Sequence, residues 1–315
     1  MMDSRTPKLT PLEAFKLEDD RVEFIRQAAK LEWWTILFMI TVVVFMYLTA
    51  GQSESMKTAL LEDVLSLIPP AAFLIGSRMA AREPDHWFPY GYRRATLVAY
   101  LAASVALMGL GLFAFYESSS SLISGSRPTL GLVSVFGYEI WEGWLMLMAI
   151  LYSAVPPVFL GRKKEALAKK LEDPTLSADA ATNRADWLTG LAAALGVLGI
   201  GVGWWWADVT MALMISIDIV RDGTVYLRNA VGAIMDKAPS QMGEEHLPHP
   251  IIEDIRKYVS QDLGLEIVEF RLRSIGLFFT GYLSVDRVDS IEEEELADMI
   301  EDKFHLIHDL NVAYR

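Results

Sequence analysis

Two carboxylates and an amide share one predicted helix face in the second half of the chain. Asp179, Asn183 and Asp186 lie in the stretch SADAATNRADWLTG, and residues at i, i+4 and i+7 fall on one side of a helix. The apolar stretch LAAALGVLGIGVGWWW follows directly, and ionisable groups in such a setting are costly and usually functional. Because divalent cations take oxygen ligands of this kind, we predict a metal site on this face. For Asp179 the alternative of a helix-capping acid, which complements the helix dipole, stays open.

A second apolar stretch, LLEDVLSLIPPAAFLIG, contains another pair of oxygen-bearing side chains. Asp63 and Ser66 lie at i and i+3, on one face of a helix, and Pro69 and Pro70 interrupt the backbone hydrogen bonds one turn later. We predict that Asp63 faces the 179/183/186 face across the bundle and supplies the second carboxylate. The alternative is that the acids of this stretch lie solvated at the outer membrane surface.

The elements that must position these side chains are long apolar segments. The chain has 315 residues, of which 52% are hydrophobic, and these residues cluster in runs. A transmembrane helix needs roughly 20 apolar residues. Runs near that length occur at about 33–50, 57–77, 95–117, 139–161, 180–204 and 207–231. The sequence therefore predicts an α-helical polytopic membrane protein with six transmembrane helices.

Charge distribution predicts the orientation and restricts the partners. The net charge of −13 leaves no basic face for a nucleic acid. Basic residues concentrate after the second and fourth runs, which places both termini in the cytoplasm by the positive-inside rule. The first thirty residues are charged and lack the apolar core of a signal peptide, and the sequence contains no cysteine. We therefore expect a multi-pass protein of the cell inner (plasma) membrane.

The expected domain organisation has three parts. Residues 1–32 form a charged cytoplasmic segment, residues 33–237 the six-helix transport domain, and residues 238–315 a small cytoplasmic α+β domain. In the last part an amphipathic helix (251–263) precedes two alternating segments around Gly276, which indicate a β-hairpin. Ser290 and Glu293 have the spacing of a capping box and predict a second helix, and LNVAYR is expected to be a strand. The order is α-β-β-α-β.

The loop between the second and third runs carries a resemblance to a known family. Residues Phe88 to Arg94, in the stretch REPDHWFPYGYRRATL, resemble the corresponding loop of the cation diffusion facilitators, and the span count and C-terminal domain are similar as well. The resemblance covers nearly the whole chain. It implies a homodimer that exports a divalent metal cation in exchange for protons, with acids on the second and fifth helices forming the transport site.

Two positions of the metal site depart from the family pattern. The family's fifth-helix aspartate falls on Asp186, but its usual partner four residues earlier falls on Thr182. On the second helix the first aspartate falls on Asp63 and the second on Leu67, beside which Ser66 is the nearest oxygen. A site without imidazole favours harder ions such as Mn²⁺, Fe²⁺ or Mg²⁺ over Zn²⁺, although the choice among these four stays open.

The predicted metal ligands are all oxygen or amide side chains, and the chain is expected to need no cofactor besides the transported cation. They are Asp63, Ser66, Asp179, Asn183 and Asp186.

Two further features follow from the resemblance. Some family members bind a second metal in the loop, but here only Asp85 matches, so no second site is expected there. A basic residue at the start of the third helix pairs in the family with an acid after the sixth and locks the dimer. Arg94 and Asp236 occupy those positions.

The sequence and the resemblance thus predict a secondary transporter in the lipid bilayer that exports a divalent metal cation in exchange for protons. The incomplete ligand set leaves one alternative open, a transport-inactive member of the same fold that acts as a scaffold or partner subunit. We do not expect an enzyme, because the sequence offers no nucleophile paired with a base, no histidine cluster and no glycine-rich phosphate loop.

Overall fold

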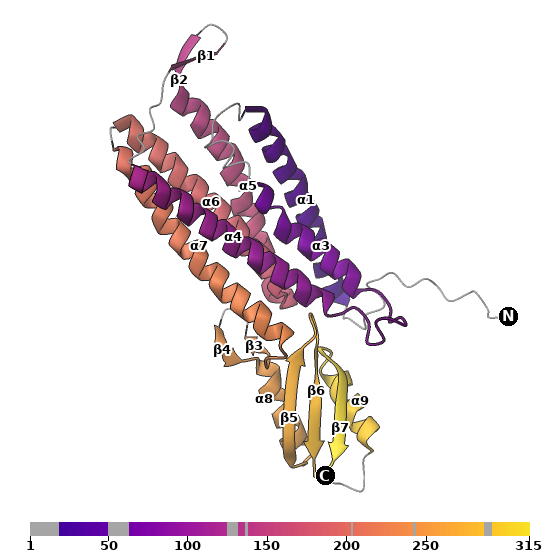
Figure 1. Ribbon diagram of the computed structural model, residues 1–315. Coiled ribbons are helices and arrows are strands. Elements are labelled where there is room, and N and C mark those ends of the chain that lie inside the picture. The colour runs from indigo at the N-terminus through magenta and orange to yellow at the C-terminus, as the bar shows by residue number, and fades with distance from the viewer. Residues whose placement is uncertain are drawn as a thin grey trace, which may run out of the picture.

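The computed structural model describes residues 19–49, 63–124, 132–135, 138–202, 204–241, 244–286 and 292–315. Long helices form an elongated bundle, and a small sheet domain lies at one end of it (Figure 1). In chain order the bundle begins with α1 (Asp19–Thr49), the shorter α3 (Ile68–Ala80) and α4 (Ala95–Ser124). They are followed by α5 (Glu142–Leu171), α6 (Pro174–Val202) and α7 (Trp205–Ile234).

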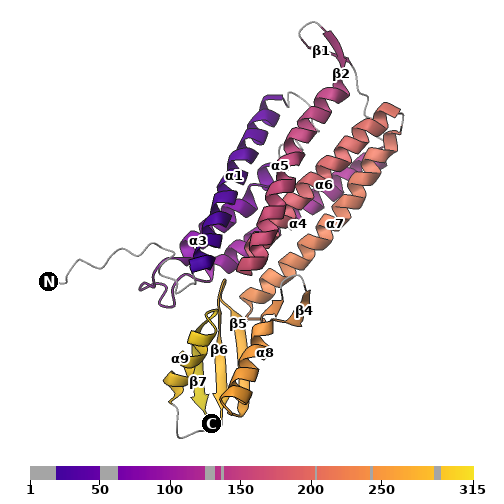
Figure 2. The ribbon, with the colours of Figure 1, turned by 180° about the vertical axis from the view of Figure 1, so that it is seen from behind.

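The bundle is held by two closely packed helix pairs, α4 with α7 and α5 with α6 (Figure 2). Small residues permit the close approach, as is common where helices associate in a membrane. A Cβ atom at Gly223 would lie 2.8 Å from the Cα of Met108, and one at Gly190 would lie 2.6 Å from the Cβ of Ala154. Either glycine therefore fits only because it lacks a side chain.

Two of the described helices are long and apolar enough to cross a membrane, at 21–45 and Ala95–Ser124. The helices α5, α6 and α7 have 30, 29 and 30 residues, which at about 1.5 Å per residue exceeds a bilayer core. They carry charged residues within that length. The mostly helical architecture is confirmed, whereas the six spans stay a prediction.

The second predicted run is a broken helix. Residues 63–65 are helical, Ser66 and Leu67 form a turn, and α3 begins at Ile68. Pro69 and Pro70 occupy the first positions of α3, where the missing proline N–H groups would have no helical acceptor. The prolines therefore place a break next to Ser66.

The fourth predicted run has different bounds in the structure. The strands β1 (Leu132–Val135) and β2 (Tyr138–Trp141) form an antiparallel hairpin at the end of the bundle far from the sheet domain (Figure 1). The helix consequently begins at Glu142 instead of 139. It also continues to Leu171, so that residues 162–170, expected in a loop, are helical.

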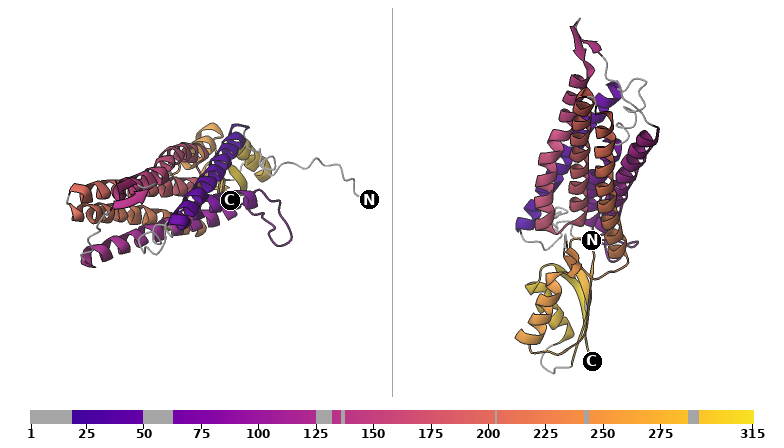
Figure 3. Two further views of the ribbon diagram at one scale, coloured as in Figure 1. Left: turned by 90° about the horizontal axis from the view of Figure 1, so that it is seen from above. Right: turned by 90° about the vertical axis from the view of Figure 1, so that its left-hand side faces the viewer.

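The C-terminal domain has the predicted α-β-β-α-β order. Strands β5 (Ile267–Ser274), β6 (Phe279–Val285) and β7 (Ile307–Tyr314) form one sheet in that order, with β5–β6 antiparallel and β6–β7 parallel. Helix α8 (Pro250–Lys257), extended by a π-helical turn at Tyr258–Asp262, and helix α9 (Glu293–Lys303) cover one face of the sheet (Figure 3). The fully buried residues of the core between these helices and the sheet are Ile255, Val259, Leu283, Val285, Leu296 and Ile300.

Residues 238–250 have the proline, glycine and charge content of a linker, but they contain a short ribbon of β3 (Ser240–Gln241) and β4 (Glu244–Pro248). The predicted turn of the β5–β6 hairpin contains Gly276, with φ +106°. A Cβ at Gly276 would lie 2.1 Å from the Oγ1 of Thr96 at the start of α4. The hairpin turn therefore rests directly on the bundle. The predicted capping residue Ser290 lies outside the described residues.

Candidate metal site

The start of α6 fixes the face on which its polar residues lie. Asp173 precedes the helix, and its Oδ1 accepts hydrogen bonds from the backbone N–H groups of Thr175 (2.8 Å) and Leu176 (3.2 Å). This is the arrangement of an N-cap aspartate, and Pro174 at the first helical position suits it. Burial raises the pKa of Asp173. The register of Asp179, Asn183 and Asp186 on one side of α6 follows from this start.

Asp186 and Ser66 meet between α6 and the break before α3. The hydroxyl of Ser66 donates a hydrogen bond of 2.8 Å to the Oδ1 of Asp186. Asp63 lies near enough for its charge to act on Asp186, and both carboxylates are half-buried. The structure thus joins two of the five predicted ligands, Ser66 and Asp186, by a hydrogen bond, and Asp63 lies in their neighbourhood.

The other two predicted ligands belong to a neighbouring cluster. Asp179 forms an ion pair with Lys164 of α5, and Lys164 also contacts Glu32 of α1, with 2.8 Å between Nζ and Oε2. All three side chains are 0% exposed. The amide of Asn183 donates to the backbone oxygen of Asp179 at 2.9 Å. We name Glu32, Lys164 and Asp179 the buried triad.

At the position where the family places a ligand beside Asp186, the hydroxyl of Thr182 donates to the backbone oxygen of Ala178 at 3.2 Å. Within the described ranges, no three histidine, aspartate or glutamate side chains converge as a ready metal cluster. Glu62, the other acid of the second run, lies outside those ranges.

Sequence reasoning missed Glu32 and Lys164. The sequence places Glu32 in the charged N-terminal segment, and Lys164 among the basic residues that follow the fourth apolar run and indicate orientation. The structure extends both helices past these positions, so that α1 runs from Asp19 and α5 runs to Leu171. The signal in the sequence was a lysine that lies within a long helix, seven residues before its end. Its partners could not be identified from spacing, because they lie on two other helices.

A second group of charges, also missed, lies on another side of α6. Arg184 pairs with Asp222 of α7 and, at 3.3 Å, with Asp218. Arg184 and Asp218 are about half exposed. Since residues 184 and 186 are about 200° apart around a helix, this group and the Asp186 site face different neighbours.

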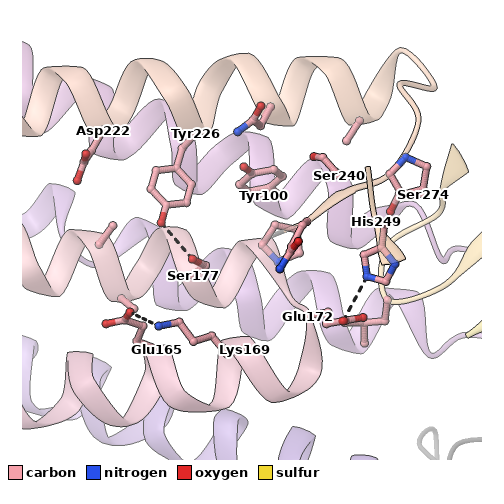
Figure 4. A pocket seen from close by; sticks show the side chains of 18 of the residues that line it. Tyr100, Glu165, Lys169, Glu172, Ser177, Asp222, Tyr226, Ser240, His249 and Ser274 are labelled. Atoms are coloured by element: carbon pink, nitrogen blue, oxygen red, sulfur yellow. Dashed lines mark hydrogen bonds and ion pairs between the residues drawn. The ribbon is translucent and has the colours of Figure 1, made fainter. Parts of the chain in front are cut away.

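A cavity of about 680 Å³ lies where the ends of α5, α6 and α7 nearest the sheet domain meet the β3–β4 ribbon (Figure 4). Within it the hydroxyls of Ser177 and Tyr226 are 3.0 Å apart. The Nε2 of His249 lies 3.2 Å from the Oε1 of Glu172, and this hydrogen bond lowers the pKa of Glu172. The contact joins the α5–α6 turn to the start of α8. Asp186 does not line this cavity.

Arg94 and Asp236 pair within one chain, with 2.7 Å between Nη2 and Oδ1. Arg273 of β5 contacts the other oxygen of Asp236, also at 2.7 Å. Asp236 therefore bridges the start of α4 to the sheet domain. A role of the pair in locking a dimer stays a prediction.

Asp85 organises the loop before α4. Its Oδ1 accepts hydrogen bonds from the backbone N–H groups of Trp87 and Phe88, each at 2.8 Å, and its Oδ2 accepts one from the hydroxyl of Tyr92. These hydrogen bonds, that of Tyr92 foremost, lower the pKa of Asp85. Both oxygens of Asp85 therefore stabilise the loop, and the absence of a second metal site there stays a prediction.

A bundle of membrane-length helices, a serine–aspartate contact between two of its segments and a small sheet domain together indicate a class of membrane transport proteins. Residues 33–235 match the family model described as the cation efflux transmembrane domain. The chain belongs to this family, the cation diffusion facilitators, and is therefore a membrane protein.

Three relatives show the range of the family around this chain. The manganese efflux system protein MneS of Bacillus subtilis (strain 168) is 28% identical over 169 residues, which cover 54% of this chain and 54% of the relative. The cation-efflux pump FieF of Shewanella oneidensis is 24% identical over 273 residues, covering 86% and 85%. A cadmium, cobalt and zinc/H(+)-K(+) antiporter of Bacillus velezensis is 25% identical over 203 residues, covering 62% and 57%. The matched segment spans about half the length of the manganese efflux relative.

Proposed function

We propose that the chain exports a divalent metal cation, which binds between α3 and α6. The hydrogen bond of 2.8 Å from Ser66 to Asp186 carries this proposal. It joins a helix break to a carboxylate in the adjacent helix, and broken helices within membranes commonly line ion sites. Asp63 and Asp186 supply negative charge, and Ser66 supplies a neutral oxygen.

The remaining predicted ligands take different places in the proposal. Asn183 lies one turn from Asp186 on the same side of α6 and stays a proposed ligand through its amide oxygen. Asp179 is left out of the shell, since Lys164 already pairs with it. Water completes the coordination, as hard cations usually retain some of it.

We propose manganese as the preferred cation, with Fe²⁺ and Mg²⁺ as the nearest competitors. The described donors are oxygens alone, and imidazole or thiolate would be needed to favour zinc. A relative named as a manganese efflux protein supports this order. The antiporter relative named for cadmium, cobalt and zinc shows that softer ions occur among related proteins.

Export is proposed to run in exchange for protons. The cation displaces protons from Asp63 and Asp186 when it binds from the cytoplasm, and protons return when the bundle opens outward. The name of the antiporter relative, which includes H(+), supports this coupling. The proposal includes six spans, both termini in the cytoplasm, and a homodimer in which the Arg94–Asp236 pair stabilises the junction of the two domains.

The test is transport by the purified protein in liposomes that contain a pH-sensitive dye. Mn²⁺ added to one side should cause a proton flux that Asp186→Asn abolishes and that the exposed neighbour Lys163→Gln leaves unchanged. If neither Mn²⁺, Fe²⁺, Mg²⁺ nor Zn²⁺ evokes a flux, the chain is the transport-inactive scaffold that the sequence leaves open.

A further inference from the structure

The buried triad joins three helices through charges that water does not reach. Glu32 comes from α1, Lys164 from α5 and Asp179 from α6, and each side chain is 0% exposed. Lys164 is among the largest fully buried side chains. Charges are almost never buried so completely unless they are paired. The ion pairs within the triad therefore offset the cost of burying its three charged side chains.

The pairing is incomplete by charge and by hydrogen bonding. One ammonium group faces two carboxylates. The Oε1 of Glu32 and the Oδ1 of Asp179 are buried and have no hydrogen-bond partner among the described residues. The other oxygen of each carboxylate is held by Lys164, whose ammonium group lies 2.8 Å from the Oε2 of Glu32 and donates a hydrogen bond to the Oδ2 of Asp179. Two carboxylates that converge with unused oxygens form the kind of shell that a cation occupies.

We propose that Glu32 and Asp179 form a second cation site, whose occupant is the tethered ammonium group of Lys164. The lysine fills the place of a free divalent cation and confines metal binding to the Asp186 site. The two sites are close neighbours, because Asp179 and Asp186 lie two turns apart on the same side of α6. This inference rests on the proposed function for the Asp186 site and concerns the number of cations that the chain holds.

A lysine is suited to this part because its ammonium group is a compact point charge on a flexible stem. Its side chain reaches Asp179 and Glu32 from the last third of α5, where Gly161 allows α5 to approach α6. A Cβ at Gly161 would lie 3.1 Å from the Cβ of Asn183. The close approach of α5 and α6 brings Lys164 to Asp179, and α1 adds Glu32.

The test counts bound Mn²⁺ by equilibrium dialysis of the purified full chain in detergent, with metal measured by mass spectrometry. The wild-type chain should bind a single Mn²⁺, which Asp186→Asn removes. Lys164→Gln, which keeps the length of the side chain nearly constant but removes its charge, should add a second Mn²⁺. The double variants Lys164→Gln/Glu32→Gln and Lys164→Gln/Asp179→Asn should lose that second ion. Lys163→Gln, the exposed neighbour, is the matched control and should bind as the wild type does.

The outcomes separate this inference from the proposed function. If Lys164→Gln binds no more Mn²⁺ than the wild type, the inference is wrong, whatever the Asp186 site does. If the wild type binds none while Lys164→Gln gains an ion that Glu32→Gln removes, the inference holds and the proposed function fails.

A second variant covers the case in which Lys164→Gln does not fold. Asp179→Asn leaves Lys164 paired with Glu32, and the inference predicts wild-type affinity for the single Mn²⁺. A loss of affinity of about tenfold or more, the size expected when a ligand or its direct support is removed, would make Asp179 a metal ligand and overturn the inference.

Discussion

Two carboxylates on one side of α6 have opposite surroundings. Asp186 receives a hydrogen bond from a neutral hydroxyl, that of Ser66, and lies near a second acid. Asp179, seven residues earlier, pairs with Lys164 and is completely buried. The sequence pattern does not distinguish Asp179 from Asp186, because a spacing of seven residues places both side chains on the same face of the helix. The partner from the neighbouring helix decides which of the two is open to a cation.

The comparison separates Asp186, the proposed cation-binding carboxylate, from Asp179, a carboxylate that pairs with a buried lysine. A carboxylate that faces a neutral donor and another acid gains most when a cation arrives. A carboxylate already paired with a buried ammonium group would have to lose that partner first. Any substitution that changes one site without the other therefore tests the distinction.

The largest expected effect is on transport at Asp186. Asp186→Asn should reduce Mn²⁺ flux in liposomes by at least about 100-fold, and Asp63→Asn should act in the same direction, because each removes half of the proposed charge. Ser66→Ala removes only a neutral oxygen and should cost about tenfold. Normal flux in both aspartate variants, with normal folding by size-exclusion chromatography, would remove the site assignment.

The buried triad should dominate stability instead. Lys164→Met leaves two buried carboxylates without a counter-charge, and breaking a buried pair in this way costs roughly 3–5 kcal/mol of unfolding free energy. Lys163→Met, one residue earlier and exposed, should change it by less than about 0.5 kcal/mol. Thermal or denaturant unfolding in detergent measures both. Equal stabilities of the two variants would show that the triad is not a structural lock.

Introducing a histidine should sharpen the metal preference. Thr182 is buried one turn before Asp186, at the position where the family resemblance places a ligand. Thr182→His adds an imidazole nitrogen, which suits Zn²⁺ better than Mn²⁺. We expect zinc to gain about tenfold over manganese, a difference of roughly 1.4 kcal/mol. Calorimetry that finds tight zinc binding in the parent and no gain in the variant would refute the oxygen-ligand argument.

A smaller effect is expected where the two domains meet. Asp236 holds both Arg94 and Arg273, so Asp236→Ala removes two pairs and Arg94→Ala removes one. Because these side chains are 40–48% exposed, each pair is worth about 0–1 kcal/mol. Crosslinking of dimers should show the greater weakening in Asp236→Ala, and the charge-swapped Arg94→Asp/Asp236→Arg should recover part of it. Unaltered dimers and flux in both single variants would end the analogy with the family's locking pair.

The smallest effect is a pH dependence at the His249–Glu172 contact. The hydrogen bond from His249 lowers the pKa of Glu172 below its ordinary value of 4.5. A depressed carboxyl pKa contributes stability that is present above that value and is lost as the pH falls through the lower, folded pKa. Hydrogen exchange at residues 249–252 should therefore quicken only in that acidic range. In Glu172→Gln, exchange should be faster at neutral pH and lack this dependence; a parental profile in the variant would refute the contact's role.

Much of the architecture could be predicted because it depends on local patterns. Helical periodicity and apolar run length indicated the bundle, and alternation around Gly276 indicated the β5–β6 hairpin. The hairpin at 132–141 was not predicted, since the apolar residues at its end resemble the start of a membrane helix. The β3–β4 ribbon was missed because its proline and glycine content is typical of a linker.

The site was predictable only as far as spacing within one helix reaches. Asp186 and Ser66 were identified by their places in apolar runs, and the structure brings them together. The pairing of Asp179 with Lys164 depends on how α5 lies against α6, and that of Glu32 on α1. Residue spacing within one segment does not show which residues of another helix it contacts. The sequence therefore offered no reason to place Lys164, which follows the fourth apolar run, beside Asp179 and Glu32.

Anomalous diffraction from crystals of the full chain soaked in MnCl₂ tests the central claim most directly, since it places the cation relative to both carboxylates. We predict a manganese peak about 2.0–2.2 Å from an oxygen of Asp186, a usual distance for small divalent cations, and none between Glu32 and Asp179. A peak at Asp179 with Lys164 turned away, or a fully loaded crystal with no peak at Asp186, would contradict the account.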